Sequence, residues 1–575
     1  MFKFLSFCAA GLLLLSPGSL RGQASGGYTP IALDNLNAFE APSSTWKLTP
    51  ELMMSPTSAT VMSNDKKGGG ILVGTAGQKL TTKVIMQDLR LRFGFMLSPG
   101  ARAYITLPGG SRVLLAEGGP VNGANISTSG YTGTVPIQNA TKAAGLWQTM
   151  ELSYDASTIR PDMARLNSLI LNGVAVQQGD YFPLSRPVSG DEPLAFEVIK
   201  GTVAFRNIGY QISTDRRPLS VSNITYKLYL DPWQTEKPEK LERQGSAPAI
   251  TQELGKGLKE FQLYFEGDLN VEEAGDYLFA LRQSGPRTRL SVDGKEVIGT
   301  AESRSQVQHF GTMRLEKGKH RIELLYTRFS WFPPALGVSV SKAGIRPYDL
   351  TALSSLPVPP PKPYLGVDPE GGPEMIRSFI QYQGEEAKRT HAVSVGSPAG
   401  WHYTIDLNRG ALLQAWRGPF ADVTDMWYER GEPQLLETAG LTVPISGKSS
   451  YAALSSPSAA WPDSADLNYL GYRLNADGVP MLRYAFDNAT LTDQLAADAQ
   501  GLTRTISVEG GVPSGMYALL GSGENITMVE KGLYRVDDRF YVRVDKNARV
   551  VLRNSAGKQE LLLPLGGSVT YRLFW

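Results

Sequence analysis

The stretch Thr202-Val-Ala-Phe-Arg-Asn-Ile-Gly-Tyr-Gln-Ile212 decides the fold of the N-terminal part of this chain. Its apolar and aromatic residues form a run bounded by Gly201 and by polar Ser213-Thr-Asp215, which is typical of a β-strand. Asn172-Gly173, earlier in the chain, is the dipeptide that supplies positive φ at a tight hairpin turn. Together these segments predict late strands of one β-sandwich.

Upstream segments continue the pattern of short strands. Apolar stretches alternate with clusters of Gly, Pro, Asn and Ser at a spacing of about ten residues, which favours an all-β sandwich. The predicted strands are Leu89–Phe95, Ala103–Leu107, Arg112–Leu115, Trp147–Tyr154 and Leu166–Leu171.

The hairpin and the last strand resemble a known family. Leu171-Asn-Gly-Val174, followed by a Gly-x-Val-x-Phe-Arg-Asn-Ile strand at Gly201–Ile208, is similar to the end of the 3-keto-disaccharide hydrolase-like domain, formerly a domain of unknown function. The resemblance implies a concanavalin-like jelly-roll sandwich over residues 28–213. It also implies a carbohydrate ligand that the domain cleaves or binds.

This chain departs from the family at polar positions. It keeps Gly100, Trp147 and the Asn-Gly turn, but has Ser98-Pro99 where Asn-Ser is common. Arg112-Val-Leu-Leu115 stands where the family has acidic and amide residues, and Gln148 stands where it has Asn. The retained residues belong to turns and core, so the resemblance supports the fold better than the activity.

Candidate site residues follow from the chemistry of sugars. Glycoside cleavage normally needs two carboxylates, and Glu117 and Glu151 are the candidates for this catalytic pair. A lone glutamate at a strand end is more often simply solvated. Arg102, Tyr104 and Arg112 are candidates for stacking on a sugar ring or donating hydrogen bonds to it. For Tyr104, packing against the sheet is the alternative.

A second sandwich is predicted over residues 220–346. Gly275-Asp-Tyr-Leu-Phe279, Leu290-Ser-Val-Asp-Gly294 and Gly318-Lys-His-Arg-Ile322 resemble strands of the protective-antigen-type domain. Some members of that family bind sugars through calcium. The corresponding stretch here, Arg282–Arg289, contains no acid, so a calcium site of that kind is not expected.

A proline-rich linker at 356–363 precedes a β-rich module at 364–575. Asp406–Phe420 and Gly471–Tyr484 resemble a module of large secreted bacterial proteins that accompanies haem-binding or sugar-dehydrogenase-like domains. The stretch lacks Cys-x-x-Cys-His, so no c-type haem is expected. The overall expectation is an all-β, multidomain protein with two sandwiches and a C-terminal β-rich domain.

Composition limits the function classes. A chain of 575 residues is longer than one hydrophobic core can organise, so several domains are expected. A net charge of +2 gives no electrostatic basis for binding nucleic acid or an anionic membrane. Residues 1–24 have the basic start and apolar run of a signal peptide, which predicts a secreted, periplasmic or cell-surface bacterial protein. The one cysteine, Cys8, lies in that segment. No metal, cofactor or transmembrane segment is expected in the mature chain.

Three functions remain open from the sequence. The first is a hydrolase or lyase of 3-keto-glycosides, because a 3-keto group acidifies the neighbouring C–H and makes elimination accessible to one base. The second is a non-catalytic glycan-binding or scaffold protein. The third is an accessory subunit of a periplasmic sugar-oxidising system, with periplasmic or surface proteins as partners.

Overall fold

The computed structural model describes most of the chain after the N-terminal segment. The described residues are 28–63, 68–118, 129–132, 135–156, 162–188, 190–212, 216–230, 240–283, 287–299, 308–330, 334–356, 363–429, 431, 434–456, 458–463 and 466–575. The predicted signal peptide and most of the proline-rich linker lie outside them.

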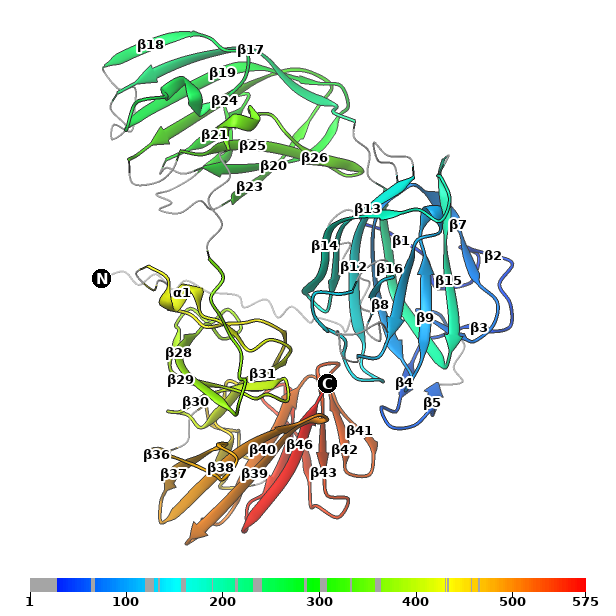
Figure 1. Ribbon diagram of the computed structural model, residues 1–575, viewed down its shortest axis with the longest axis vertical. Helices are drawn as coiled ribbons and strands as arrows, with labels where there is room; N and C mark the ends of the chain where they lie inside the picture. The colour runs from blue at the N-terminus through cyan, green and yellow to red at the C-terminus, as the bar shows by residue number, and fades with distance from the viewer. Residues whose placement is uncertain are drawn as a thin grey trace, which may run out of the picture.

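The described residues are nearly all β, which confirms the predicted fold class. Among the described residues, helix is limited to α1 (Thr424–Trp427) and to three 3₁₀ turns at Pro108–Gly110, Gln252–Gly255 and Leu353–Ser355. Figure 1 shows three groups of strands, coloured blue to cyan, green, and yellow to red along the chain. All named strands that pair in sheets do so antiparallel.

The first group is a sandwich of two sheets. The larger sheet runs in the order β14 (Val174–Pro183), β13 (Met163–Leu171), β12 (Gln148–Asp155), β8 (Asp88–Leu97), β16 (Thr202–Ile212), β6 (Ile71–Thr75) and β3 (Trp46–Thr49), with β1 (Thr29–Pro30) beside β16. The smaller, six-stranded sheet runs β11 (Gly130–Tyr131), β10 (Arg112–Ala116), β9 (Arg102–Thr106), β15 (Glu192–Lys200), β7 (Leu80–Met86) and β2 (Phe39–Glu40). A separate hairpin joins β4 (Leu52–Met54) to β5 (Val61–Ser63).

The stretch that decided the fold has the predicted role. Residues 202–212 form β16, in the middle of the larger sheet. Phe205 is fully buried, and its ring meets Phe196 of the smaller sheet with centroids 5.0 Å apart. Asn172 and Gly173 have φ of 51° and 82° between β13 and β14, which is the geometry of a two-residue hairpin turn.

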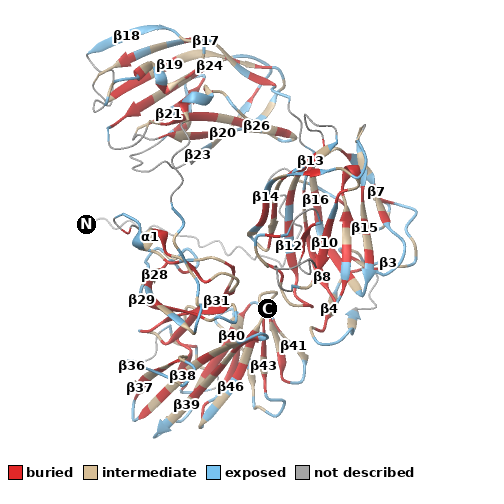
Figure 2. Ribbon diagram, viewed as in Figure 1, coloured by how far each residue is buried: buried red, intermediate tan, exposed pale blue. Residues whose placement is uncertain are grey.

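The second group is an independent sandwich with its own core. One sheet runs β18 (Leu241–Ser246), β17 (Leu219–Tyr229), β19 (Phe261–Val271), β24 (Gly318–Arg328), β21 (Arg289–Val292) and β22 (Lys295–Gly299), and the other runs β23 (Gln308–Leu315), β20 (Gly275–Gln283), β25 (Leu336–Lys342) and β26 (Ile345–Asp349). Tyr277 and Phe279 of β20 are buried together, and Asp293-Gly294 makes the β21–β22 turn. The edge strand β18 is exposed throughout (Figure 2).

The third group stacks several sheets. A three-stranded sheet runs β27 (Gly366–Val367), β32 (Ala421–Asp422) and β33 (Glu437–Thr438), and a five-stranded sheet runs β28 (Glu374–Ile380), β29 (Arg389–Gly396), β30 (Trp401–Asp406), β31 (Ala411–Arg417) and β34 (Leu441–Pro444). A four-stranded sheet runs β35 (Tyr451–Ala453), β40 (Met516–Gly523), β45 (Lys558–Pro564) and β44 (Val551–Ser555). An eight-stranded sheet runs β36 (Asn468–Leu474), β37 (Pro480–Phe486), β38 (Ala489–Asp498), β39 (Gly501–Gly510), β46 (Ser568–Phe574), β43 (Phe540–Val544), β42 (Leu533–Val536) and β41 (Ile526–Glu530).

The first and third groups share one continuous cluster of buried apolar residues. The loop before β12 carries the contact: Tyr541 Oη donates to the Ala144 carbonyl at 3.0 Å, and Lys142 Nζ donates to the Asp538 carbonyl at 2.9 Å. Burial lowers the pKa of Lys142 to about 8, although the Asp538 carboxylate acts in the opposite direction. The third group is therefore docked on the first through a largely dehydrated interface.

The first and second groups contact each other through ion pairs. The Arg346 guanidinium lies 3.0 Å from a carboxylate oxygen of Asp88 and 2.8 Å from one of Asp155. None of the described residues of the second sandwich belongs to the core cluster that the other two groups share. Its own core is complete without them.

Candidate functional site

Three of the five predicted site residues lie on one face of the six-stranded sheet. Alternate side chains of β9, β10 and β15 point into the sandwich and are buried: Ala103, Ile105, Val113, Leu115, Phe196 and Val198. The intervening residues point outward, because side chains alternate along a strand. Leu114 of β10, which pairs with Tyr104, also faces this way but is only 2% exposed. We name the polar outward-facing residues Arg102, Tyr104, Thr106, Arg112 and Glu197 the open face.

Tyr104 is at the centre of the open face. It is half-buried, and the Arg112 guanidinium carbon lies 5.4 Å from the centre of its ring. Glu197 pairs with Tyr104 across the β9–β15 ladder, so their side chains are direct neighbours. Arg102 precedes Tyr104 on the same side of β9 and is exposed. The structure therefore places the three predicted sugar-contacting residues together.

Two polar atoms of the open face are buried without a hydrogen-bond partner. They are Oε2 of Glu197 and Oγ1 of Thr106, two residues beyond Tyr104 on the same strand. Oε2 of Glu197 also has a charge partner in Lys79, whose Nζ lies 3.6 Å away. Buried polar groups are normally hydrogen-bonded, so Glu197, across the ladder from Tyr104, and Thr106, two residues along β9, suit a ligand that brings hydroxyl groups once their side chains rotate to expose these oxygens.

Glu117 lies at the end of β10 and has a structural contact. Its Oε2 accepts a hydrogen bond of 2.6 Å from the backbone N–H of Gly100. Gly100 has φ of 65° in the turn that joins β8 to β9, a conformation that favours glycine. Glu117 thus fastens the turn that leads into the strand of Tyr104.

Glu151 lies on the other sheet. It is an exposed residue of β12, paired with Arg92 of β8, on the outer surface of the larger sheet. Burial raises the pKa of the Tyr28 phenol, and the Glu151 carboxylate raises it further, while Arg90 and Arg92 lower it. The structure does not bring Glu151 and Glu117 together, because the body of the sandwich separates the two outer surfaces.

Glu197 and Thr106 are the open-face residues that the sequence reasoning missed. Leu194-Ala-Phe-Glu-Val198 alternates strictly, and this alternation already places Glu197 opposite the buried Leu194, Phe196 and Val198. The neighbour across the ladder is not visible in the sequence, since pairing with Tyr104 joins strands that are far apart in the chain.

Histidines and metal ligands offer no rival site in the described part of the chain. His402 is buried, donates from Nε2 to the Gly418 carbonyl at 2.7 Å and accepts from the Ser397 N–H, and burial lowers its pKa. His320 contacts Asp293 at 2.6 Å, and this hydrogen bond raises its pKa. Among the described residues, no group of three His, Cys, Asp or Glu side chains is placed to hold a metal. Within the same residues, no helix is long and apolar enough to cross a membrane.

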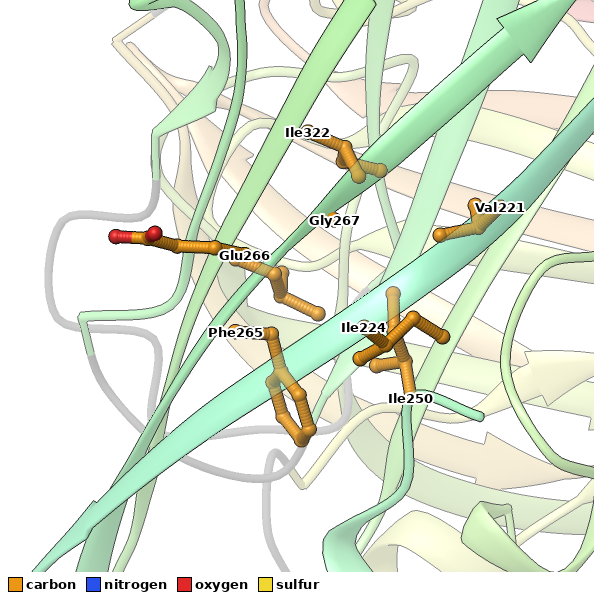
Figure 3. Close-up of a pocket in the computed structure, with 8 residues that line it drawn as sticks. Val221, Ile224, Ile250, Phe265, Glu266, Gly267 and Ile322 are labelled. Atoms are coloured by element: carbon orange, nitrogen blue, oxygen red, sulfur yellow. The ribbon is translucent and has the colours of Figure 1, made fainter. Parts of the chain in front are cut away.

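The hollow in the second sandwich is a packing gap. It is lined mostly by apolar side chains such as Val221, Ile224 and Ile322 and is too narrow for a water molecule (Figure 3). The carboxylate of Glu266 points away from this cluster and pairs with Arg321 at 3.0 Å. It is therefore no ligand site. Larger hollows lie where β20, β25 and β26 meet β8 and β16, and beside Gln138 and Gly440.

Comparison with known proteins gives distant structural matches alone. No family model matches the sequence, and no curated protein matches it. A candidate glycosyl hydrolase from Parabacteroides distasonis is 16% identical, with a TM-score of 0.24, covering 32% of this chain and 99% of that one. The GH31 alpha-xylosidase from Xanthomonas citri is 11% identical, with a TM-score of 0.20, covering 57% of this chain and 38% of the enzyme. At such TM-scores the alignments carry no weight for the function of this chain.

Proposed function

We propose that this protein is an extracytoplasmic carbohydrate-binding protein whose open face takes the glycan. The observation that carries the proposal is the position of Tyr104, with the Arg112 guanidinium beside its ring, Glu197 across the ladder and Thr106 two residues along the same strand. An aromatic face accepts the C–H face of a pyranose ring. Guanidinium and carboxylate groups bind its hydroxyls.

The placement of the predicted catalytic pair favours binding over hydrolysis. Glu117 accepts a hydrogen bond from Gly100, and Glu151 lies on the opposite surface. A retaining or inverting glycosidase needs two carboxyl groups about 5–10 Å apart across one bond. Glu192, the other acid of β15, already binds Arg186 and the N–H of Gly109. The open face therefore offers Glu197 alone.

Binding to oligosaccharides tests the proposal. Calorimetric titration with cellohexaose, maltohexaose and xylohexaose is expected to give saturable binding to at least one of them. Tyr104→Ala should weaken the open-face component about tenfold, since loss of an aromatic contact costs roughly 1–1.5 kcal/mol. Glu151→Gln, on the opposite surface, is the matched control and should bind like the wild type. Equal affinities for wild type and Tyr104→Ala would contradict the proposal.

Cleavage of 3-keto-glycosides is the second candidate, and one observation favours it. Elimination beside a 3-keto group needs a single base, and Glu197 presents a carboxylate oxygen without a hydrogen bond beside Tyr104. The test is sugar release from 3-keto-disaccharides and from their unoxidised parents. Release that Glu197→Gln abolishes, with binding kept, would establish the enzyme. Glu117→Gln and Glu151→Gln are the controls.

A further inference from the structure

A second hollow with sugar-type chemistry lies in the third group of strands, between two sheet edges. β28 is the edge of the five-stranded sheet and β36 is the edge of the eight-stranded sheet. A cavity of about 490 Å³ opens between them. We name its lining the tyrosine groove; the residues are Met375, Arg377, Val393, Leu407, Tyr469, Gly471 and Tyr472.

A β-bulge puts two tyrosines on the same wall of the groove. Residues three apart on a regular strand point to opposite faces. The register of β36 shifts between Tyr469 and Gly471, so that Tyr469 lies opposite Tyr484 and Tyr472 lies opposite Leu482. Both partners are buried on the inner face of the sheet, and Gly471 has φ of 101°, which favours glycine. The bulge therefore turns Tyr469 and Tyr472 to the same side.

Arg377 stands on the opposite wall. It is an exposed residue of β28, two positions after Met375 on the same side of the strand, and pairs with Val393. Burial raises the pKa of the Tyr469 phenol, and the charge of Arg377 is close enough to act in the opposite direction. Val393 and Leu407 are buried and form an apolar floor. The Tyr472 side chain remains 52% exposed at the mouth.

We propose that the tyrosine groove is a second glycan site, which takes neutral pyranose residues of an oligosaccharide. Ligand sites are concave and mostly apolar, with a few placed polar groups, and the groove has this composition. The two phenol rings supply faces for stacking, and the Arg377 guanidinium supplies five donors for ring hydroxyls. The inference does not rest on the open face, because the two sites share no residue and no sheet.

The groove is tested in a Tyr104→Ala background, in which the open-face component is weakened. Titration with cellohexaose, maltohexaose and xylohexaose should show residual binding, and adding Tyr472→Ala should weaken it about tenfold. Arg377→Met should weaken it severalfold through lost donors. Tyr181→Ala is the matched control: Tyr181 is 53% exposed and has the Arg165 guanidinium 5.4 Å from its ring, but it lies on β14 of the first sandwich and is no part of the groove lining. This variant should bind like its parent.

The two sites fail in different ways. Binding abolished by Tyr104→Ala and unaffected by Tyr472→Ala would overturn the groove and leave the proposed function standing. Binding that depends on Tyr472 and not on Tyr104 would overturn the open face and leave the groove standing. Wild-type protein that binds none of the three hexasaccharides would overturn the groove as a neutral-glycan site. A normal thermal unfolding transition for each variant shows that the change is local.

Discussion

The open face and the tyrosine groove present similar chemistry on different supports. Both place tyrosine near arginine, yet the open face lies within one sheet and needs only the register of β9, β10 and β15, with its shift between Val198 and Lys200. The groove needs a bulge in β36 and a fixed distance between two sheets. A sheet surface is therefore specified by the pairing of strands within one sheet. The shape of a groove between two sheets depends in addition on the contacts that hold those sheets together.

We expect the largest loss of stability when the buried ion pair in the sheet that carries the groove is broken. Asp493 of β38 and Arg504 of β39 form a fully buried ion pair at 2.6 Å, and the Tyr451 hydroxyl donates to the same carboxylate at 2.5 Å. Asp493→Ala leaves a buried guanidinium without its counter-charge, which costs about 3–5 kcal/mol of unfolding free energy. Urea denaturation measures this loss of unfolding free energy. Glycan binding to the groove should be lost as well, because the sheet that carries β36 no longer keeps its native structure.

Asp498 provides the matched control on the same strand. It also pairs with an arginine, Arg572, at 2.5 Å, but its side chain is 49% exposed. Asp498→Ala should cost less than about 1 kcal/mol, because exposed ion pairs contribute little. Equal losses for the two variants would show that the buried pair does not support the sheet as described.

The second prediction concerns the interface that holds the two sites in one body. The pKa of Lys142 falls from its ordinary value to about 8 through burial against the third group of strands. Below pH 8 the native protein bears the cost of a buried charge, and between about pH 8 and 10.5 the unfolded chain binds more protons than the native chain. The free energy of unfolding should therefore rise over this window, by an amount on the order of 1–3 kcal/mol.

Denaturant midpoints at pH 7.5 and 9.5 measure the effect of Lys142. Lys142→Met removes the titrating group and keeps most of the apolar stem, so the rise should be reduced in this variant. Lys47, an exposed residue of β3, is the control position. A rise of the same size in Lys142→Met and Lys47→Met would contradict a dehydrated interface at Lys142.

The third prediction tests whether the Arg112 guanidinium contributes hydrogen bonds to glycan binding at the open face. Arg112→Met keeps the length of the side chain over Tyr104 and removes its donors. Glycan affinity should fall roughly fivefold, equivalent to about 1 kcal/mol, with little change in stability because Arg112 is exposed. Calorimetry measures the affinity, and an unchanged value would remove Arg112 from the site.

The smallest expected effect concerns Glu117. Glu117→Gln replaces a charged acceptor for the Gly100 N–H with a neutral one, so stability should fall by about 1 kcal/mol or less. Glycan affinity should stay at the wild-type value, because the side chain fastens a turn and is not part of the open face. Lost sugar release in this variant, with binding intact, would restore Glu117 as a catalytic residue.

Local patterns in the sequence were enough for the strands and turns. Residues 202–212 form β16, and Asn172-Gly173 makes a tight turn, because period-two alternation and positive-φ dipeptides act over a few residues. Arg102, Tyr104 and Arg112 meet because β9 and β10 are joined by a short connection. Such contacts follow from short-range pairing.

Long-range relations were beyond the sequence. The pairing of Glu197 with Tyr104 and the separation of Glu151 from Glu117 depend on which strand enters which sheet. The core shared by the first and third groups joins Ala144 to Tyr541, and no local pattern encodes that contact. The resemblance to the 3-keto-disaccharide hydrolase-like family stays a prediction, since no family model matches the chain.

The most direct test of the glycan-binding open face is a crystal structure of the protein soaked with the hexasaccharide that binds it best. We expect a pyranose ring stacked on Tyr104, with hydroxyls within hydrogen-bond distance of the Glu197 carboxylate and the Thr106 hydroxyl. A bound sugar that contacts other surfaces while Tyr104, Glu197 and Thr106 remain untouched would contradict it.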